Sequence, residues 1–308
     1  MSKCAVLDLG TNIFHLLIAQ ADARQPNGWT PLCRDRAPVH LAEEGIERIG
    51  PAAFQRGLEA LRRFREQTQK HGVALADVRA FGTAALRTAQ NAPEFLHAVE
   101  QETGIRPEII SGEREAELIF KGVLQAVPFP EGNALVMDIG GGSVEFIVAQ
   151  ASQVRWQQSF PVGTTVLFHR FHKSDPIAPE EVAALKAYLE EALAELWAML
   201  AKYPTHTLIG AAGAFDTLDE MLNLPQTPPA LYGYLSHEGF ERLYARIVSS
   251  TLAERSSWPD LKPERRLTIV VGMILIRHVL ERTQARDVYA SKYSLKEGAV
   301  AEWIAASP

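Results

Sequence analysis

A duplication constrains this chain more than any other feature. Residues 6–20 read VLDLGTNIFHLLIAQ and residues 136–150 read VMDIGGGSVEFIVAQ. Each copy predicts an apolar strand that ends in an aspartate, a tight turn of small residues and a second apolar strand. Because Asp8 matches Asp138 and Gly10 matches Gly140, the repeat predicts two similar half-domains rather than two unrelated hairpins.

Both turns have the composition of an anion-binding turn. Their residues are Gly10, Thr11 and Asn12 in the first copy and Gly140, Gly141, Gly142 and Ser143 in the second. Successive N–H groups of such a turn can point into one concavity, because glycine tolerates the required backbone angles and carries no Cβ. A single hairpin with such a corner needs no ligand. The pair predicts a cleft between two domains in which phosphate is bound.

Length and composition favour a globular protein of two domains. The 308 residues are enough for two cores, and Pro128 to Gly132 breaks the pattern just before the second hairpin. We therefore expect domains at 1–127 and 128–308. A net charge of −6 argues against a general nucleic-acid binder.

The cysteine content and the apolar segments indicate in which cellular compartment the protein is expected. Cys4 and Cys33 have no patterned partner, so neither a disulfide framework nor a zinc site is expected. The amino terminus lacks a leader-like apolar run, and the most apolar later stretch, residues 269–276, is too short to span a bilayer. We expect a cytoplasmic protein that does not bind membranes.

The periodicity along the chain predicts an α/β fold. After the first hairpin we expect strands near 30–39, 78–81 and 107–110 and helices over 51–71, over 91–103 and after Ser111. After the second hairpin we expect strands near 155–160, 207–209 and 287–290 and a long helix over 180–202. Two later segments, 240–248 and 264–282, read as helices.

Several polar residues are candidates for chemistry. Glu115 falls in a first helical turn, where a glutamate also simply complements the helix dipole. Glu145 interrupts a buried strand, and a charge there needs a partner or a function. Arg87 follows a small-residue turn at residues 82–85 and could bind phosphate or could be an ordinary surface arginine. The turn from Gly210 to Gly213 precedes a helix and could admit an anion there.

Five segments, taken together and in order, resemble the exopolyphosphatase and guanosine pentaphosphate phosphohydrolase family. They are DLGTN at 8–12, GTAALR at 82–87, ISGEREA at 110–116, DIGGGSVE at 138–145 and SLKEG at 294–298. The resemblance covers nearly the whole chain and matches the short form of that family. It implies two ribonuclease-H-like domains of the actin, hexokinase and Hsp70 superfamily, with a cleft between the domains.

The resemblance also implies roles. Glu115 would be the catalytic base that orients a water, and Asp138 and Glu145 would support Mg²⁺ and the reacting phosphate, with Asp8 as a further metal ligand. The phosphate-binding residues implied, beyond the two turns, are Thr83, Arg87, Gly210 and Gly213. Such a protein would remove the terminal phosphate of inorganic polyphosphate and also of guanosine pentaphosphate, assisted by a monovalent cation, as a homodimer.

The sequence departs from the family pattern in places, and two other functions stay open. Ala214 stands where threonine is usual, Gly163-Thr164-Thr165 replaces a loop with arginine, and Lys296 stands where arginine is frequent. The chain also lacks the added helical domains of long exopolyphosphatases, so we expect little processive digestion of long polymers. The alternatives are an ATP-dependent small-molecule kinase of the same superfamily and a non-catalytic sensor of polyphosphate or guanosine alarmones.

Overall fold

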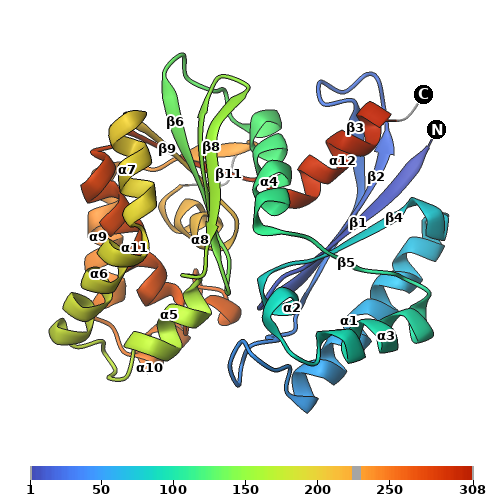
Figure 1. Cartoon of the computed structure of the whole chain (residues 1–308), viewed down its shortest axis with the longest axis horizontal. Coiled ribbons are helices and arrows are strands. Elements are labelled where there is room, and N and C mark those ends of the chain that lie inside the picture. The colour runs from blue at the N-terminus through green and yellow to red at the C-terminus, as the bar shows by residue number, and fades with distance from the viewer. Residues whose placement is uncertain (1, 224–229, 307–308) are drawn as a thin grey trace. The chain divides into compact units, whose positions relative to one another are not determined.

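The computed structural model describes residues 2–223 and 230–306, which form two compact units. The first unit holds the chain up to Gln125 together with the segment that begins at Ser294, and the second runs from Ala126 to Tyr293. Figure 1 shows one twisted sheet with flanking helices in each unit. The expected division at 127/128 lies close to the observed break, but it was wrong for residues 294–306, which return to the first unit.

The first unit is built on a five-stranded sheet in the order β3-β2-β1-β4-β5. Its strands are β1 (Lys3–Leu9), β2 (Ile13–Ala21), β3 (Trp29–Pro38), β4 (Val78–Gly82) and β5 (Glu108–Ile109). The pairs β1/β2 and β2/β3 are antiparallel, whereas β4 runs parallel to both β1 and β5. This order and these directions are those of the ribonuclease-H-like fold that the resemblance implies.

Helices cover both faces of this sheet. They are α1 (Pro51–Lys70), α2 (Ala84–Thr88), α3 (Ala92–Thr103), α4 (Gly112–Ala126) and α12 (Leu295–Ala306). Helices α1 and α3 pack on one face, and α12 lies along β1 and β2 on the other (Figure 1). Helix α12 crosses α4 so closely that a Cβ on Gly298 would overlap the Leu118 carbonyl. This contact explains why the last helix belongs to the first unit.

The second unit repeats the sheet and extends it by one strand, in the order β10-β11-β9-β6-β7-β8. Its strands are β6 (Asn133–Ile139), β7 (Val144–Gln150), β8 (Gln153–Phe160), β9 (Thr207–Ala211), β10 (Tyr232–Tyr234) and β11 (Asp287–Ser291). Strands β6 to β8 form an antiparallel meander, and β9 and β11 continue it in parallel. The duplication predicted from the hairpins therefore extends to the whole strand order.

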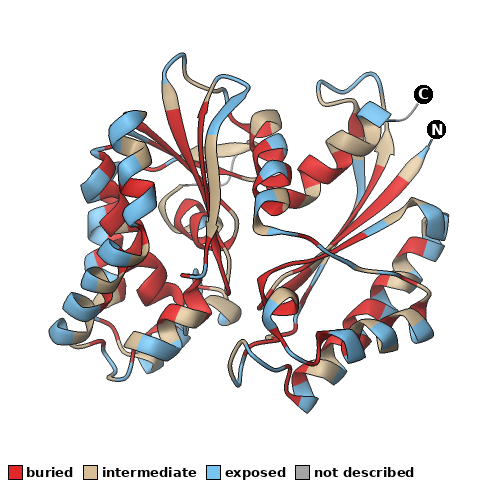
Figure 2. Cartoon of the chain, in the orientation of Figure 1, coloured by how far each residue is buried: buried red, intermediate tan, exposed pale blue. Residues whose placement is uncertain are grey.

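The helices of the second unit surround a large apolar core. They are α5 (Thr164–Phe171), α6 (Pro179–Ala192), α7 (Ala194–Lys202), α8 (Gly213–Leu222), α9 (His237–Val248), α10 (Leu252–Ser257) and α11 (Ile269–Thr283). Figure 2 shows that the central strands are buried along their length, as their continuous apolar sequences require. Among the described residues, no helix combines the length and apolar character needed to cross a bilayer.

Local predictions and structure differ at two points. The single helix expected over 180–202 is two helices, because the backbone of Leu193 leaves the helical region at φ −103° and ψ 17°. Leu193 is fully buried, so the break keeps the inward side chains of both helices on the core. The loop read at residues 163–165 holds the N-cap and the first residues of α5, whose short length gave little periodic signal.

Candidate active site

The first half-site comprises Asp8, the turn from Gly10 to Asn12, Thr83, Arg87 and Glu115, all in the first unit. Asp8 lies next to the end of β1 and is paired in register with His15 of β2. Burial raises the pKa of the Asp8 carboxyl, and the nearby charge of Lys296 on α12 opposes that rise. The sequence pattern placed Asp8 at the turn correctly, but only the return of α12 brings a lysine beside it.

Backbone hydrogen bonds fix the direction of the first turn. The carbonyl of Asn12 accepts from the amides of Val39 and His40, and that of Thr11 accepts from Leu41. These donors follow β3, so the carbonyl groups of the turn are directed toward the segment after the third strand. Gly10 is required by space, because a Cβ there would stand 2.9 Å from the Ile13 carbonyl oxygen.

Arg87 and Glu115 meet in an ion pair. Nη1 of Arg87 donates to Oε2 of Glu115 at 2.6 Å and to the carbonyl of Ile110 at 3.0 Å. Glu115 is 8% exposed and lies in the first turn of α4. Ser111 caps that helix, since its Oγ accepts from the amide of Arg114 at 3.2 Å. The two residues come from separate elements, so their pairing depends on how β4 and β5 place α2 and α4.

Thr83 joins the carboxyl ends of two neighbouring strands. It follows β4 directly, and its amide and its hydroxyl both donate to the carbonyl of Leu9, each at a distance of 3.4 Å. Leu9 is the last residue of β1. Thr83 is therefore held at the same sheet edge as Asp8, which is where ligands of α/β sheets usually bind.

The second half-site comprises Asp138, the turn from Gly140 to Ser143, and Glu145, all in the second unit. Asp138 of β6 is paired in register with Glu145 of β7, so both carboxylates lie on one face of the sheet. Glu145 is 1% exposed, and its Oε1 accepts from the hydroxyls of Ser143 and Ser159, each at 2.7 Å. The buried charge that the sequence marked as needing partners thus has two hydroxyl donors.

The turn of the second half-site is held in the same way as that of the first. The amides of Thr164 and Thr165, at the start of α5, donate to the carbonyls of Gly140 at 3.0 Å and Gly141 at 2.9 Å. A Cβ on Gly163 would overlap the backbone of Gly141. In both units, then, the segment after the third strand binds the carbonyl groups of the turn. Among the described residues, the amides of Gly141 and Gly142 donate to no backbone carbonyl.

The turn from Gly210 to Gly213 is filled by the protein itself. The ring of Phe215 lies against Gly210, and the guanidinium of Arg265 lies against Gly213, so a Cβ at either glycine would overlap these groups. Ala212 between them has φ 57° and ψ 179°. Packing is sufficient to explain both glycines, and their assignment to phosphate binding stays a prediction.

Neither half-site holds three metal-binding side chains of the usual kinds. Among residues 2–223 and 230–306, no group of three His, Cys, Asp or Glu is placed to hold a metal ion. Mg²⁺ in phosphate-handling sites commonly uses one or two carboxylates and completes its coordination with waters and substrate oxygens. The opposed carboxylates of Asp138 and Glu145 fit that mode, whereas Asp8 is opposed by a histidine.

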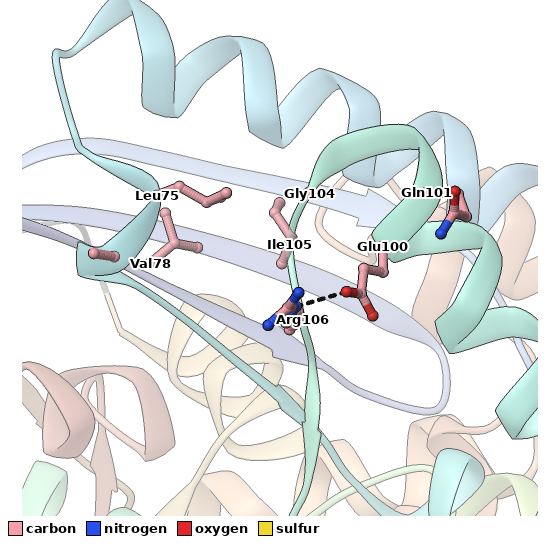
Figure 3. Close-up of a pocket in the computed structure, with 8 residues that line it drawn as sticks. Leu75, Val78, Glu100, Gln101, Gly104, Ile105 and Arg106 are labelled. Carbon is pink, nitrogen blue, oxygen red and sulfur yellow. Dashed lines mark hydrogen bonds and ion pairs between the residues drawn. The ribbon is translucent and has the colours of Figure 1, made fainter.

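A surface pocket of about 540 Å³ in the first unit belongs to neither half-site. It is lined by Leu75, Val78, Ile105 and neighbouring residues, among them Arg106 and Glu100, which form an ion pair (Figure 3). Val78 is the first residue of β4, whereas Thr83 follows the last. The pocket is therefore at the opposite end of that strand from the residues expected to carry chemistry.

Two units with the same strand order, each with an aspartate before a small-residue turn at the sheet edge, define a class of protein with two ribonuclease-H-like domains. The comparisons with known proteins identify the family. A model of the Ppx/GppA phosphatase family matches residues 17–306, and the chain belongs to that family.

Individual relatives support the assignment. The structure is similar to that of an exopolyphosphatase from Cytophaga hutchinsonii, with a TM-score of 0.94 and 35% identity, covering 100% of this chain and 99% of the other. The Ppx-GppA enzyme of Aquifex aeolicus has a TM-score of 0.80 and 26% identity, covering 98% and 99% of the two chains.

A third relative is a longer protein. A guanosine-5'-triphosphate,3'-diphosphate pyrophosphatase of Aeromonas salmonicida (strain A449) is 31% identical over 309 residues. The match covers 96% of this chain but 58% of that protein, so this chain spans little more than half the length of that relative.

One contact of a predicted site residue was not predicted from the sequence. Ser159 was read only as part of a strand, yet it hydrogen-bonds a predicted site residue. The antiparallel meander could have predicted this contact. Once the register of β7 and β8 is known, the alternation of side chains along the two strands places Ser159 beside Glu145.

Proposed function

We propose that this protein is a phosphoanhydride hydrolase that removes the terminal phosphate of inorganic polyphosphate and also acts on guanosine pentaphosphate. The ion pair between Arg87 and Glu115 carries the proposal. It holds a largely buried carboxylate in one orientation, in which it can orient a water, next to a guanidinium that can donate to the oxygens of an anionic substrate. The family's description as phosphatases and the exopolyphosphatase neighbour support it.

In this mechanism Glu115 orients a water for attack on the terminal phosphorus. The new P–O bond forms as the bond to the bridging oxygen breaks, and the proton lost by the water passes to Glu115. Orthophosphate leaves, and the bridging oxygen becomes the new end of the shortened chain. The bonds of Arg87 to protein use Nη1, so Nε and Nη2 can donate to phosphate oxygens.

We propose Mg²⁺ as the cofactor, with Asp138 and Glu145 as its main protein ligands. When bound, Mg²⁺ would neutralise charge on the phosphate oxygens. The amides of Gly141 and Gly142 would donate to phosphate oxygens, as would the first turn with Asn12. The proposal has four further parts. A monovalent cation assists the reaction, Asp8 takes part in metal binding, the protein is a homodimer, and its location is cytoplasmic. Metal dependence would appear as loss of activity in EDTA and recovery with Mg²⁺, and light scattering would measure the subunit number.

The test is orthophosphate release by the purified protein with Mg²⁺. Side-by-side assays on short polyphosphate, long polyphosphate and guanosine pentaphosphate would rank the substrates. Replacing the base, Glu115→Gln, should lower kcat by about 10²–10⁴-fold. Glu117→Gln is the matched control, because Glu117 lies on the same helix, is exposed and pairs with Arg114.

The outcomes separate the competing functions. If the protein releases no phosphate from any of the three substrates, or if Glu115→Gln is as active as the unaltered protein, the proposed function is wrong. Tight binding of polyphosphate without turnover would favour the sensor instead. The kinase alternative has no support among the relatives, which are named as phosphatases or pyrophosphatases.

A further inference from the structure

A row of polar residues crosses three strands of the second unit. Asp138 of β6 pairs in register with Glu145 of β7, which pairs in register with Ser159 of β8. Residues directly opposite one another in an antiparallel sheet have side chains on the same face, with neighbouring strands about 4.8 Å apart. Ser159 is therefore the outer member of a row that contains two predicted site residues.

The contact between Ser159 and Glu145 is specific in its atoms. The hydroxyls of Ser159 and Ser143 both donate to Oε1 of Glu145, each at 2.7 Å. Ser143 belongs to the glycine turn, whereas Ser159 belongs to a strand of the sheet. Hydrogen bonds to a carboxylate are stronger than neutral ones, and Glu145 is almost fully buried. Ser159 thus ties the carboxylate to the rigid sheet independently of the turn.

The first unit shows that the fold does not itself require a hydroxyl at this register position. There the equivalent row is Asp8 of β1, His15 of β2 and Arg36 of β3. The sheet has the same strand order and the same antiparallel pairings. The serine in the outer position therefore occurs together with the glutamate in the middle position, and the sheet architecture does not by itself require it.

We propose that Ser159 is a positioning residue of the reaction, acting through Glu145. By binding Oε1 from the side of the sheet, it would hold the carboxylate in the orientation in which Glu145 would support Mg²⁺ and the reacting phosphate. Ser159 itself touches no substrate. This inference rests on the proposed function and adds a residue to its machinery. Neighbours that orient a metal-binding side chain typically change activity or affinity by about 10–100-fold when they are removed.

The sharpest test compares two variants of nearly equal shape. Ser159→Thr keeps a hydroxyl and Ser159→Val replaces it with a methyl group, and both β-branched residues suit a strand. We expect Ser159→Thr to keep most of the kcat for short polyphosphate and Ser159→Val to lose about 10–100-fold. KM should change little in either variant, because the contact orients a group and does not bind the ground state. Ser159→Ala should behave as Ser159→Val does.

A second readout does not depend on turnover. In the background of Glu115→Gln, titration calorimetry with tripolyphosphate at saturating Mg²⁺ measures polyphosphate binding alone, and Ser159→Val should leave the Kd of tripolyphosphate nearly unchanged. Thermal unfolding without ligand should show that the Thr and Val variants have similar Tm. Ser249→Ala is the control for loss of a serine hydrogen bond elsewhere, since the hydroxyl of Ser249 donates to the Ala245 carbonyl at the end of α9.

Each outcome is decisive. Equal kcat for the Thr and Val variants in an active protein would overturn this inference and leave the proposed function standing. A parallel rise in Kd and KM would also overturn it, because it would place Ser159 in substrate binding. An unaltered protein that is inactive on all substrates would instead remove the proposed function. A loss confined to the variants without a hydroxyl, at constant Kd and Tm, supports the positioning role.

Discussion

Nη1 of Arg87 lies 2.6 Å from Oε2 of Glu115, and the same nitrogen donates to the Ile110 carbonyl at 3.0 Å. One guanidinium therefore links α2, the segment after β5 and the first turn of α4. Its planar fork can make both bonds and still present other N–H groups, which a lysine ammonium cannot do in the same geometry.

Arg87→Lys should consequently lower kcat/KM for polyphosphate by about 10–100-fold while the protein stays folded. Steady-state kinetics and circular dichroism would measure the two quantities. Arg106→Lys is the matched control, because Arg106 pairs with Glu100 at the same 2.6 Å in the lining of the surface pocket. Equal losses in both variants would show that the Arg87 pair has no special role.

Gly163 allows the start of α5 to lie against the glycine turn of the second unit. A Cβ at this position would overlap the backbone of Gly141, so Gly163→Ala must displace the turn or the helix. We expect the variant to lose at least about 10²-fold in kcat/KM, because a displacement of about 1 Å at a reacting centre costs this much. Gly132→Ala, with no atom within 4 Å of the added Cβ, should retain activity. An active Gly163→Ala enzyme would contradict the role given to this contact.

Ala212 has backbone angles that are almost confined to glycine, with φ 57° and ψ 179°. Such a conformation costs about 1–3 kcal/mol for a residue with a Cβ. Ala212→Gly should therefore raise the free energy of unfolding, by about 0.5–2 kcal/mol after the larger entropy of glycine in the unfolded chain is subtracted. Urea unfolding would measure the change. Ala89→Gly, at φ −66° and ψ 125°, is the control and should give no gain; a gain of equal size there would contradict the assignment of strain to Ala212.

Two buried histidines should make stability depend on pH. Burial lowers the pKa of His172, assisted by Arg255 and opposed by Glu181 and Asp175. Burial also lowers the pKa of His278, opposed by Glu190. At neutral pH both rings are neutral in the folded protein, and in the unfolded chain they titrate near 6.5. The unfolded state therefore binds more protons as the pH falls below about 7, so the free energy of unfolding should decrease from there down to the lowered pKa values.

Urea unfolding at a series of pH values between 7.5 and about 5 would measure this slope. The double variant His172→Gln, His278→Gln should show a smaller decrease over the same interval, whatever its stability at pH 7.5. Equal slopes for the double variant and the unaltered protein would show that these histidines do not account for the pH dependence.

Local pattern was enough to predict much of the fold. The two hairpins, with Asp8 and Asp138 before their turns, were read from repetition and alternation alone, and the structure places both aspartates at the predicted sheet positions. The cap at Ser111 was equally readable, because it depends on residues one turn apart. The break at Leu193 was not, because the apolar stripe continues through it and packing of both helices on one core decides where the backbone bends.

The sequence by itself determined the repeat, the class of the fold and the residue types available for phosphate chemistry, because strand alternation, turns and caps are set by near neighbours. Tertiary structure alone decided which of those residues meet. Arg87 reaches Glu115 because β4 and β5 are parallel neighbours, Ser159 reaches Glu145 through the register of β7 and β8, and Lys296 approaches Asp8 because α12 returns to the first unit. These contacts join segments far apart in the chain, and long-range packing, which carries no local periodicity, creates them.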